Sequence, residues 1–190
     1  MNKVIVVGGG AAGLLAAAAA AEHGAQVTVL EKMFKPGKKL LITGKGRCNI
    51  TNDCDLQEII KNIPGNGRFL NSALRQFTNE DVVKLLNDNG LETKVERGGR
   101  VFPVSDQAKD VVDTLLKILH DLGVELVTDI CVTEVLTDTE KVIGVKTKSG
   151  KVFKADAVIV AAGGASYPGT GSDGSGFKLA EKLGTCDNTT

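Results

Sequence analysis

The first 31 residues constrain the fold most, because they place a glycine-rich turn and a helix between two apolar strands. Val4-Ile5-Val6-Val7 runs directly into Gly8-Gly9-Gly10-Ala11-Ala12-Gly13, and an alanine-rich helix leads to Val27-Thr28-Val29-Leu30 and Glu31. This order of strand, tight turn, helix and strand is typical of a unit that binds the ADP half of a dinucleotide. The pattern predicts an α/β protein with a parallel sheet.

The glycines of this turn each have a separate physical role. Gly8 allows the tight turn out of the strand, Gly10 lets the backbone approach a pyrophosphate, and Gly13 lets helix and strand pack closely. The amides of Ala11 and Ala12 stand at the helix N-terminus, where unpaired N–H groups and the helix dipole stabilise an anion. A pyrophosphate therefore needs no basic side chain at this point.

Glu31 follows the second strand, eighteen positions after Gly13. A carboxylate there can accept hydrogen bonds from both ribose hydroxyls of an adenosine, and it would repel a 2′-phosphate. A secretory signal is an alternative, because Lys3 precedes an apolar run and small residues follow, but three consecutive glycines interrupt that run. The run is also too short for a membrane span, which needs about 20 apolar residues.

Composition limits the classes of protein. The 190 residues suffice for one domain, or for one domain and a small appendage. Because 23 basic residues balance 23 acidic ones, we expect no nucleic-acid partner and no membrane-surface partner. The four cysteines have neither CxxC spacing nor the density of a disulfide scaffold, so we expect no metal site and a cytoplasmic location.

The middle of the chain alternates loops and helices. One helical turn is expected at Lys38 to Leu41, with longer helices at 68–77 and 79–89, the latter capped by Thr78 or Asn79. An extended stretch at 92–96 precedes a helix from Ser105 to about Leu122. The buried stripe of that helix is expected to contain Val111, Val112, Leu115, Leu116 and Leu119.

Short apolar runs follow that helix. Gly123 ends the helix and 124–127 reads as a third parallel strand. Runs at 130–136, 142–147 and 152–155, separated by turn residues, predict a three-stranded antiparallel meander. A nicotinamide dehydrogenase usually has a further helix at this place, so the meander disfavours that class. A buried parallel strand at 157–161 and a helix at about 176–183 complete the pattern.

Three further blocks carry a family resemblance. They are Lys39-Leu40-Leu41-Ile42-Thr43-Gly44-Lys45-Gly46-Arg47-Cys48-Asn49-Ile50-Thr51-Asn52, Gly99-Arg100-Val101-Phe102-Pro103 and Ala162-Gly163-Gly164-Ala165-Ser166-Tyr167-Pro168. Together with the N-terminal unit they resemble the BaiN/RdsA-like flavoproteins, which are bacterial NAD(P)/FAD-dependent oxidoreductases. The resemblance implies a Rossmann-like FAD-binding fold, non-covalent FAD, and NAD(P)H as a candidate electron donor.

The resemblance also implies further cofactor contacts. Gly44 and Gly46 would let a loop approach the pyrophosphate or the flavin, and Arg47 could bind a phosphate or a reduced flavin. A polar loop rich in turn residues is the alternative. The other residues implied to bind the cofactor are Lys32, Lys39, Asn49, Val132, Ala162 and Gly163. A simple turn after a buried strand is the alternative for the last two.

No catalytic residue can be assigned. Tyr167 is a candidate general acid by position, and packing is an equal alternative. Cys48 is expected to pack rather than react, and His23 and His120 are expected to be solvated at helix ends. Arg97 and Arg100 could hold an anionic substrate or be surface charges.

The end of the chain departs from the family pattern. We expect residues 1–184 to form an FAD/NAD(P)-binding domain, the N-terminal part of a longer flavoprotein, and 185–190 to be an atypical polar tail. Two hypotheses remain. In one, FAD passes hydride from NAD(P)H to an organic acceptor, a small-molecule substrate. In the other, the chain is a truncated, catalytically inactive nucleotide-binding module. Under either hypothesis, uncovered apolar surface where a substrate domain would dock could promote self-association.

Overall fold

The computed structural model describes residues 1–139 and 141–184. The chain divides into two compact units. The first unit contains residues 1–39 and the chain from Leu115 onward, and the second unit contains residues 40–114. Each unit is described by itself below.

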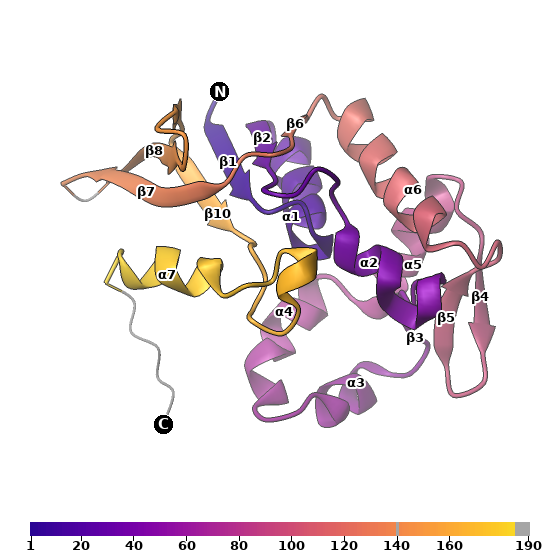
Figure 1. Ribbon diagram of the computed structural model, residues 1–190. Coiled ribbons are helices and arrows are strands. Elements are labelled where there is room, and N and C mark those ends of the chain that lie inside the picture. Colours follow the sequence, from indigo (N-terminus) through magenta and orange to yellow (C-terminus); the bar gives the residue numbers. More distant parts are fainter. Residues whose placement is uncertain (140, 185–190) are drawn as a thin grey trace. The chain divides into compact units, whose positions relative to one another are not determined.

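A four-stranded parallel sheet forms the centre of the first unit, in the order β10-β1-β2-β6 (Figure 1). Its strands are β1 (Lys3–Val7), β2 (Gln26–Leu30), β6 (Glu125–Val127) and β10 (Ala157–Val160). Helix α1 (Ala11–Glu22) connects β1 to β2. Val6 and Val29 are fully buried, as expected of β-branched residues on the inner strands of a parallel sheet. The expected N-terminal β-α-β unit is confirmed.

The expected antiparallel meander is also present in the first unit. It consists of β7 (Val132–Asp138), β8 (Lys141–Thr147) and β9 (Val152–Lys154), shown in orange in Figure 1. Val135 and Val145 of the meander share a hydrophobic core with Ile5 of β1 and with Leu179 of α7 (Ser175–Glu181). A short 3₁₀ helix, η3 (Pro168–Thr170), precedes α7. The fold class is therefore α/β, with a Rossmann-like parallel sheet and an inserted three-stranded antiparallel meander, as the sequence predicted.

The second unit contains a small antiparallel sheet in the order β3-β5-β4. Its strands are β3 (Thr51–Asn52), β4 (Thr93–Glu96) and β5 (Arg100–Pro103), and its helical segments are η1 (Thr43–Gly46), α3 (Leu56–Asn62), η2 (Gly67–Leu70), α4 (Asn71–Gln76) and α5 (Asn79–Asp88). Thr78 and Asp81 form a capping box at the start of α5. Helices α2 (Lys38–Ile42) and α6 (Ala108–Asp121) span the two boundaries between the units.

Several details differ from the sequence prediction. The segment predicted as one helix at 68–77 is η2 followed by α4, and in α6 Ile118 is buried while Leu116 is half-buried. Helix α3 was not expected, although Asp55 caps it by accepting a hydrogen bond from the Glu58 N–H. Helix α6 begins at Ala108 rather than Ser105, because Asp106 adopts a left-handed conformation (φ 56°) that a helix excludes. Strand β10 is not buried: it is the outermost strand of the sheet, beside β1, and Val160 is 38% exposed.

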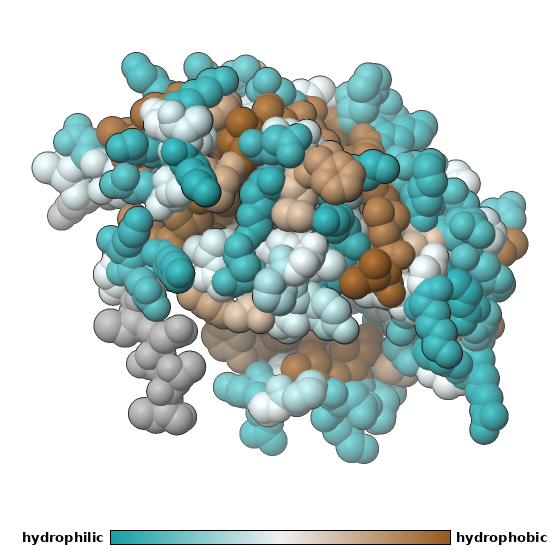
Figure 2. All heavy atoms as spheres, in the orientation of Figure 1, coloured by the Kyte–Doolittle hydropathy of each residue, from teal (hydrophilic) through white to brown (hydrophobic). Residues whose placement is uncertain are grey.

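The surface is mixed in polarity. Figure 2 shows hydrophobic residues in brown among hydrophilic residues in teal. Exposed apolar side chains of the first unit include Phe34, Ile143, Val152 and Phe177. Within residues 1–139 and 141–184, no helix has the length and apolar character that crossing a bilayer requires.

Candidate functional site

The carboxyl ends of β1, β2 and β10 lie side by side. This end of the sheet, where the parallel strands finish, is here called the sheet edge. The register pairs Val7 with both Leu30 and Val160. The Gly8 N–H donates to the Leu30 carbonyl oxygen at 2.9 Å, and the Ala161 N–H donates to the Val7 carbonyl oxygen at 2.9 Å. The residues that follow these strands therefore meet at the edge where ligands bind in open α/β sheets.

The glycines after β1 differ in what surrounds them. Gly8 has φ 108°, and a Cβ there would lie 2.5 Å from the Ala161 carbonyl oxygen. A Cβ on Gly13 would overlap the Gly8 carbonyl oxygen, whereas one on Gly10 would meet nothing within 4 Å. Gly8 and Gly13 are thus required by the protein's own packing, and Gly10 leaves space at the start of α1.

The N-terminus of α1 has the properties of an anion site. Gly10 is its N-cap and supplies no side-chain hydrogen bond, and the first turn contains no acidic residue. Ala11 and Ala12 are exposed, so small side chains surround the first amides. These N–H groups lack intrahelical acceptors and carry the positive end of the helix dipole. They fit a pyrophosphate group without any change of side chain.

Glu31 is 8% exposed and is held by two backbone amides. Its Oε2 accepts a hydrogen bond from the Gly9 N–H at 2.6 Å, and its Oε1 accepts one from the Met33 N–H at 2.7 Å. A carboxylate has about four lone-pair positions, so each oxygen keeps a further acceptor position. The carboxylate is therefore fixed at the sheet edge with capacity for two hydroxyl donors.

Lys32 and Lys39 both face the segment that follows β10. Lys32 Nζ lies 2.6 Å from Asp173 Oδ1 and 3.0 Å from Ser175 Oγ. Lys39 Nζ lies 3.4 Å from Ser166 Oγ and 5.8 Å from the centre of the Tyr167 ring. Both ammonium groups thus have partners within the first unit.

The remaining predicted residues of the first unit are Val132, Ala162 and Gly163. Gly163 has φ 73°, and a Cβ there would lie 2.6 Å from Ser172 Oγ. Ala162 stands beside it at the sheet edge. Val132 begins β7 and packs its side chain into the core, so only its main chain could serve a ligand.

Gly44, Gly46, Arg47 and Asn49 belong to the second unit. Gly44 is left-handed (φ 56°), and a Cβ there would lie 2.8 Å from the Asn49 nitrogen and 2.9 Å from Phe102 Cε1. Gly46 has φ 85° and more open surroundings, with the Leu41 carbonyl oxygen 4.0 Å from the Cβ position. Packing inside the second unit therefore requires the glycine at 44.

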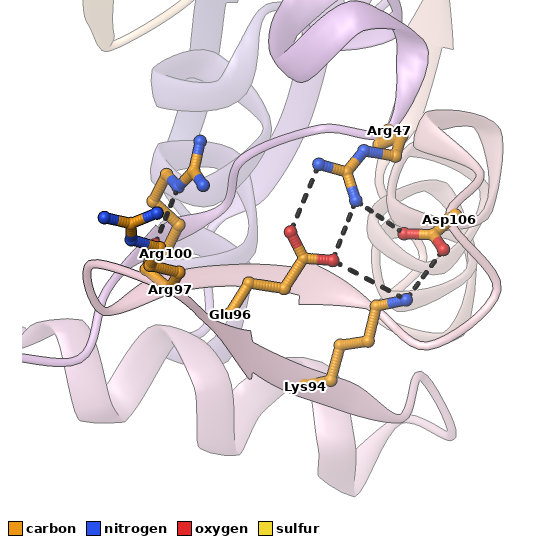
Figure 3. Close-up of polar contacts among 6 residues, drawn as sticks. All are labelled: Arg47, Lys94, Glu96, Arg97, Arg100 and Asp106. Atoms are coloured by element: carbon orange, nitrogen blue, oxygen red, sulfur yellow. Dashed lines mark hydrogen bonds and ion pairs between the residues drawn. The ribbon is translucent and has the colours of Figure 1, made fainter.

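Arg47 is engaged with two carboxylates (Figure 3). Its Nη1 lies 2.8 Å from Glu96 Oε1 and 3.1 Å from Asp106 Oδ1, and its Nη2 lies 3.2 Å from Glu96 Oε2. The guanidinium carbon lies 4.0 Å from the centre of the Phe102 ring. Lys94 completes the network at 2.7 Å from Asp106. The sequence suggested a phosphate or flavin ligand, and the structure shows an arginine paired within its own unit.

This network shifts the titration of its acids. The hydrogen bond from Arg47 holds the pKa of Glu96 below its ordinary value. The hydrogen bond from Lys94 does the same to the pKa of Asp106, with Arg47 adding to it. Nearby, Arg100 donates to the Arg97 carbonyl oxygen at 3.1 Å.

Other candidate residues occupy ordinary environments. Cys48 is 1% exposed, and burial raises the pKa of its thiol, which favours a packing role. His23 caps the end of α1 and His120 is exposed in the last turn of α6, as expected of helix-end residues. Tyr167 is 60% exposed. Among the described residues, no cluster of His, Cys, Asp and Glu could hold a metal ion.

Comparison with known proteins identifies relatives of this chain. The model of the family described as HI0933-like protein Rossmann domain matches residues 2–186. The chain is 40% identical over 161 residues to the 3-dehydro-bile acid delta(4,6)-reductase of Clostridium scindens, covering 84% of this chain and 38% of that protein. It is 33% identical over 162 residues to the ribosomal RNA dihydrouridine synthase of Escherichia coli, covering 85% and 39%.

A solved structure shares the fold. The 3-ketosteroid-delta4-(5alpha)-dehydrogenase of Rhodococcus jostii matches with a TM-score of 0.65 and 21% identity, covering 87% of this chain and 47% of that chain. The chain spans less than half the length of each of these relatives. The family that the sequence motifs indicated is confirmed, and the structural likeness agrees with the fold class.

Proposed function

The chain belongs to the HI0933-like Rossmann-domain family, and from that premise we propose that it binds FAD and serves an NAD(P)H-linked oxidoreductase reaction. One observation carries the proposal: a buried, amide-held carboxylate at Glu31 stands at the same sheet edge as the N-terminus of α1, where no side chain caps the first amides. An adenosine ribose needs the first feature and a pyrophosphate needs the second.

The residues of the first unit divide the work of binding. The amides of Ala11 and Ala12 would hold the pyrophosphate, next to the open position at Gly10. Glu31 would accept the ribose hydroxyls, and the main chain at Val132, Ala162 and Gly163 would contact the remainder. FAD, when bound, supplies a centre that accepts hydride from NAD(P)H and passes it to an organic acceptor. The loop containing Gly46 and Asn49 remains a proposed contact.

The acceptor we propose is a small molecule with a conjugated carbon–carbon double bond. The name of one relative specifies a bile acid reductase and that of the other a synthase acting on ribosomal RNA. The equal numbers of basic and acidic residues favour a small molecule over RNA, which attracts basic surfaces. An RNA-binding assay at low salt tests this choice, and tight binding that weakens steeply with salt would contradict it.

The second candidate is a nucleotide-binding module without catalysis. The residues that carry the first proposal also favour this one, because Glu31 and the N-terminus of α1 would bind the adenosine ribose and the pyrophosphate, which take no part in hydride transfer. Titrating the purified chain with FAD, then adding NADH or NADPH without oxygen, separates the candidates. Bleaching of the flavin supports the oxidoreductase; bound FAD that neither nicotinamide reduces supports the module.

A further inference from the structure

Lysines that follow β2 hold the loop at 162–174, here called the glycine loop. Lys32 contacts Asp173 and Ser175, the latter just beyond the loop. Lys38 Nζ donates to the Gly169 carbonyl oxygen at 3.2 Å, and Lys39 contacts Ser166. These contacts join segments more than 120 residues apart in sequence, all within the first unit. The glycine loop is thus fixed at several points along its length.

Among these lysine contacts, the hydrogen bond from Lys32 to Ser175 is the least exposed to solvent. The Lys32 side chain is 19% exposed, and a Cβ on Gly171 would lie 3.3 Å from Lys32 Cε, so the loop packs along the aliphatic stem. Asp173 Oδ1 also accepts the Ser175 N–H at 3.1 Å. The hydrogen bond from Lys32 is the main reason that the pKa of Asp173 lies far below its ordinary value. The lowered pKa keeps the Asp173 carboxylate charged at a lower pH than an isolated aspartate would be.

The position of Lys32 connects two parts of the candidate cofactor site. It directly follows Glu31, whose carboxylate is fixed by backbone amides. Its ammonium reaches the far end of the loop that begins with Ala162 and Gly163. Gly163, Gly171 and Gly174 all have positive φ, so the loop has flexible points that a side-chain contact must restrain.

We propose that Lys32 is a positioning residue, which fixes the glycine loop at the sheet edge through Asp173 and Ser175 instead of contacting FAD. The proposal rests on the proposed FAD function. Two of the three ammonium donors are already used, and Asp173 neutralises the charge that a phosphate would need. Lys32 therefore acts on FAD through Ala162 and Gly163.

Hydrogen exchange of the chain without FAD tests the positioning directly. Lys32→Met should make amides in 163–174 exchange about fivefold faster, the size expected of one partly buried ion pair, while amides of β1 and β2 keep their rates. Lys32→Arg should restore most of the protection, and Asp173→Asn should reproduce the loss. Lys35→Met is the matched control, because Lys35 stands in the same segment and lies 5.9 Å from the Phe34 ring. Unchanged exchange in Lys32→Met would overturn the proposal.

FAD titration of the same variants completes the test. Lys32→Met should weaken FAD binding about fivefold and Lys35→Met should leave it unchanged. Weakened binding in Lys32→Met without faster loop exchange would identify Lys32 as a direct ligand and refute the positioning role. A wild-type chain that binds no FAD would refute the proposed function, together with any role of Lys32 in it. Wild-type binding with equal binding by Lys32→Met refutes the role of Lys32 alone.

Discussion

Replacing Glu31 by glutamine tests the structural core of the candidate site. The two carboxylate oxygens accept different amides, Oε2 that of Gly9 and Oε1 that of Met33. Glutamine keeps the shape but has one acceptor oxygen and one NH₂ group. The NH₂ group of the glutamine would then face the backbone N–H of either Gly9 or Met33, which would be left without an acceptor. Glu31 is 8% exposed in the native protein, so water could replace that acceptor only in part.

The expected cost follows from these contacts. A hydrogen bond to a charged acceptor contributes about 1.5–3 kcal/mol, and a buried amide left without an acceptor costs about 1–3 kcal/mol. We expect Glu31→Gln to lower the free energy of unfolding by about 3 kcal/mol. In a chain of this size, about 3 kcal/mol corresponds to a fall in melting temperature of about 6–12 °C.

Urea unfolding and thermal melting of the chain without FAD measure this cost. Glu22→Gln is the matched control, since Glu22 is exposed at the end of α1 and should change stability by less than about 0.5 kcal/mol. FAD binding should also weaken in Glu31→Gln, because a ribose hydroxyl loses a charged acceptor. A Glu31→Gln protein that melts like the control would show that the two amide contacts do not hold the site together.

Three further predictions concern the glycines and the arginine network. Gly13→Ala should destabilise the fold by about 3 kcal/mol because its Cβ overlaps a backbone carbonyl, whereas Gly10→Ala should fold normally and weaken FAD binding; equal melting temperatures would refute the distinction. Gly44→Ala should lower the melting temperature, because its Cβ is crowded and φ is 56°; an unchanged transition would contradict this. Arg47 lowers the folded-state pKa of Glu96, so the stabilisation is present above the unfolded-state pKa of about 4 and is lost as pH falls through the folded value. The urea midpoint should therefore fall more between about pH 5 and about pH 3 in the wild type than in Arg47→Met. An equal fall in both proteins would contradict a stabilising pair between Arg47 and Glu96.

Local patterns in the sequence predicted most of the first unit. Alternation of apolar strands with the glycine turn predicted the sheet edge at Gly8 and Glu31, and the spaced turn residues predicted the meander. The prediction that β10 is buried was wrong, because an apolar run in the sequence looks the same for an outermost strand as for a central one. Helix α3 was missed, although Asp55 followed by Glu58 is a recognisable helix start.

The partners of the charged site residues were not predictable. Arg47 pairs with acids 49 and 59 positions away, and Lys32 pairs with an acid 141 positions away. No periodicity links such distant residues, and a lysine or arginine in a glycine-rich loop is equally compatible with a phosphate and with a carboxylate. The structure shows side-chain carboxylates as their partners, which changes the expected effect of mutating them.

The visible absorption spectrum of the purified 190-residue chain, recorded after incubation with FAD and removal of the unbound cofactor, tests the central claim most directly. The account predicts that a flavin spectrum stays with the wild-type protein, and that Gly10→Ala, which should fold normally, retains less of it. A folded wild-type chain that remains colourless would contradict the assignment of Glu31 and the α1 N-terminus to FAD.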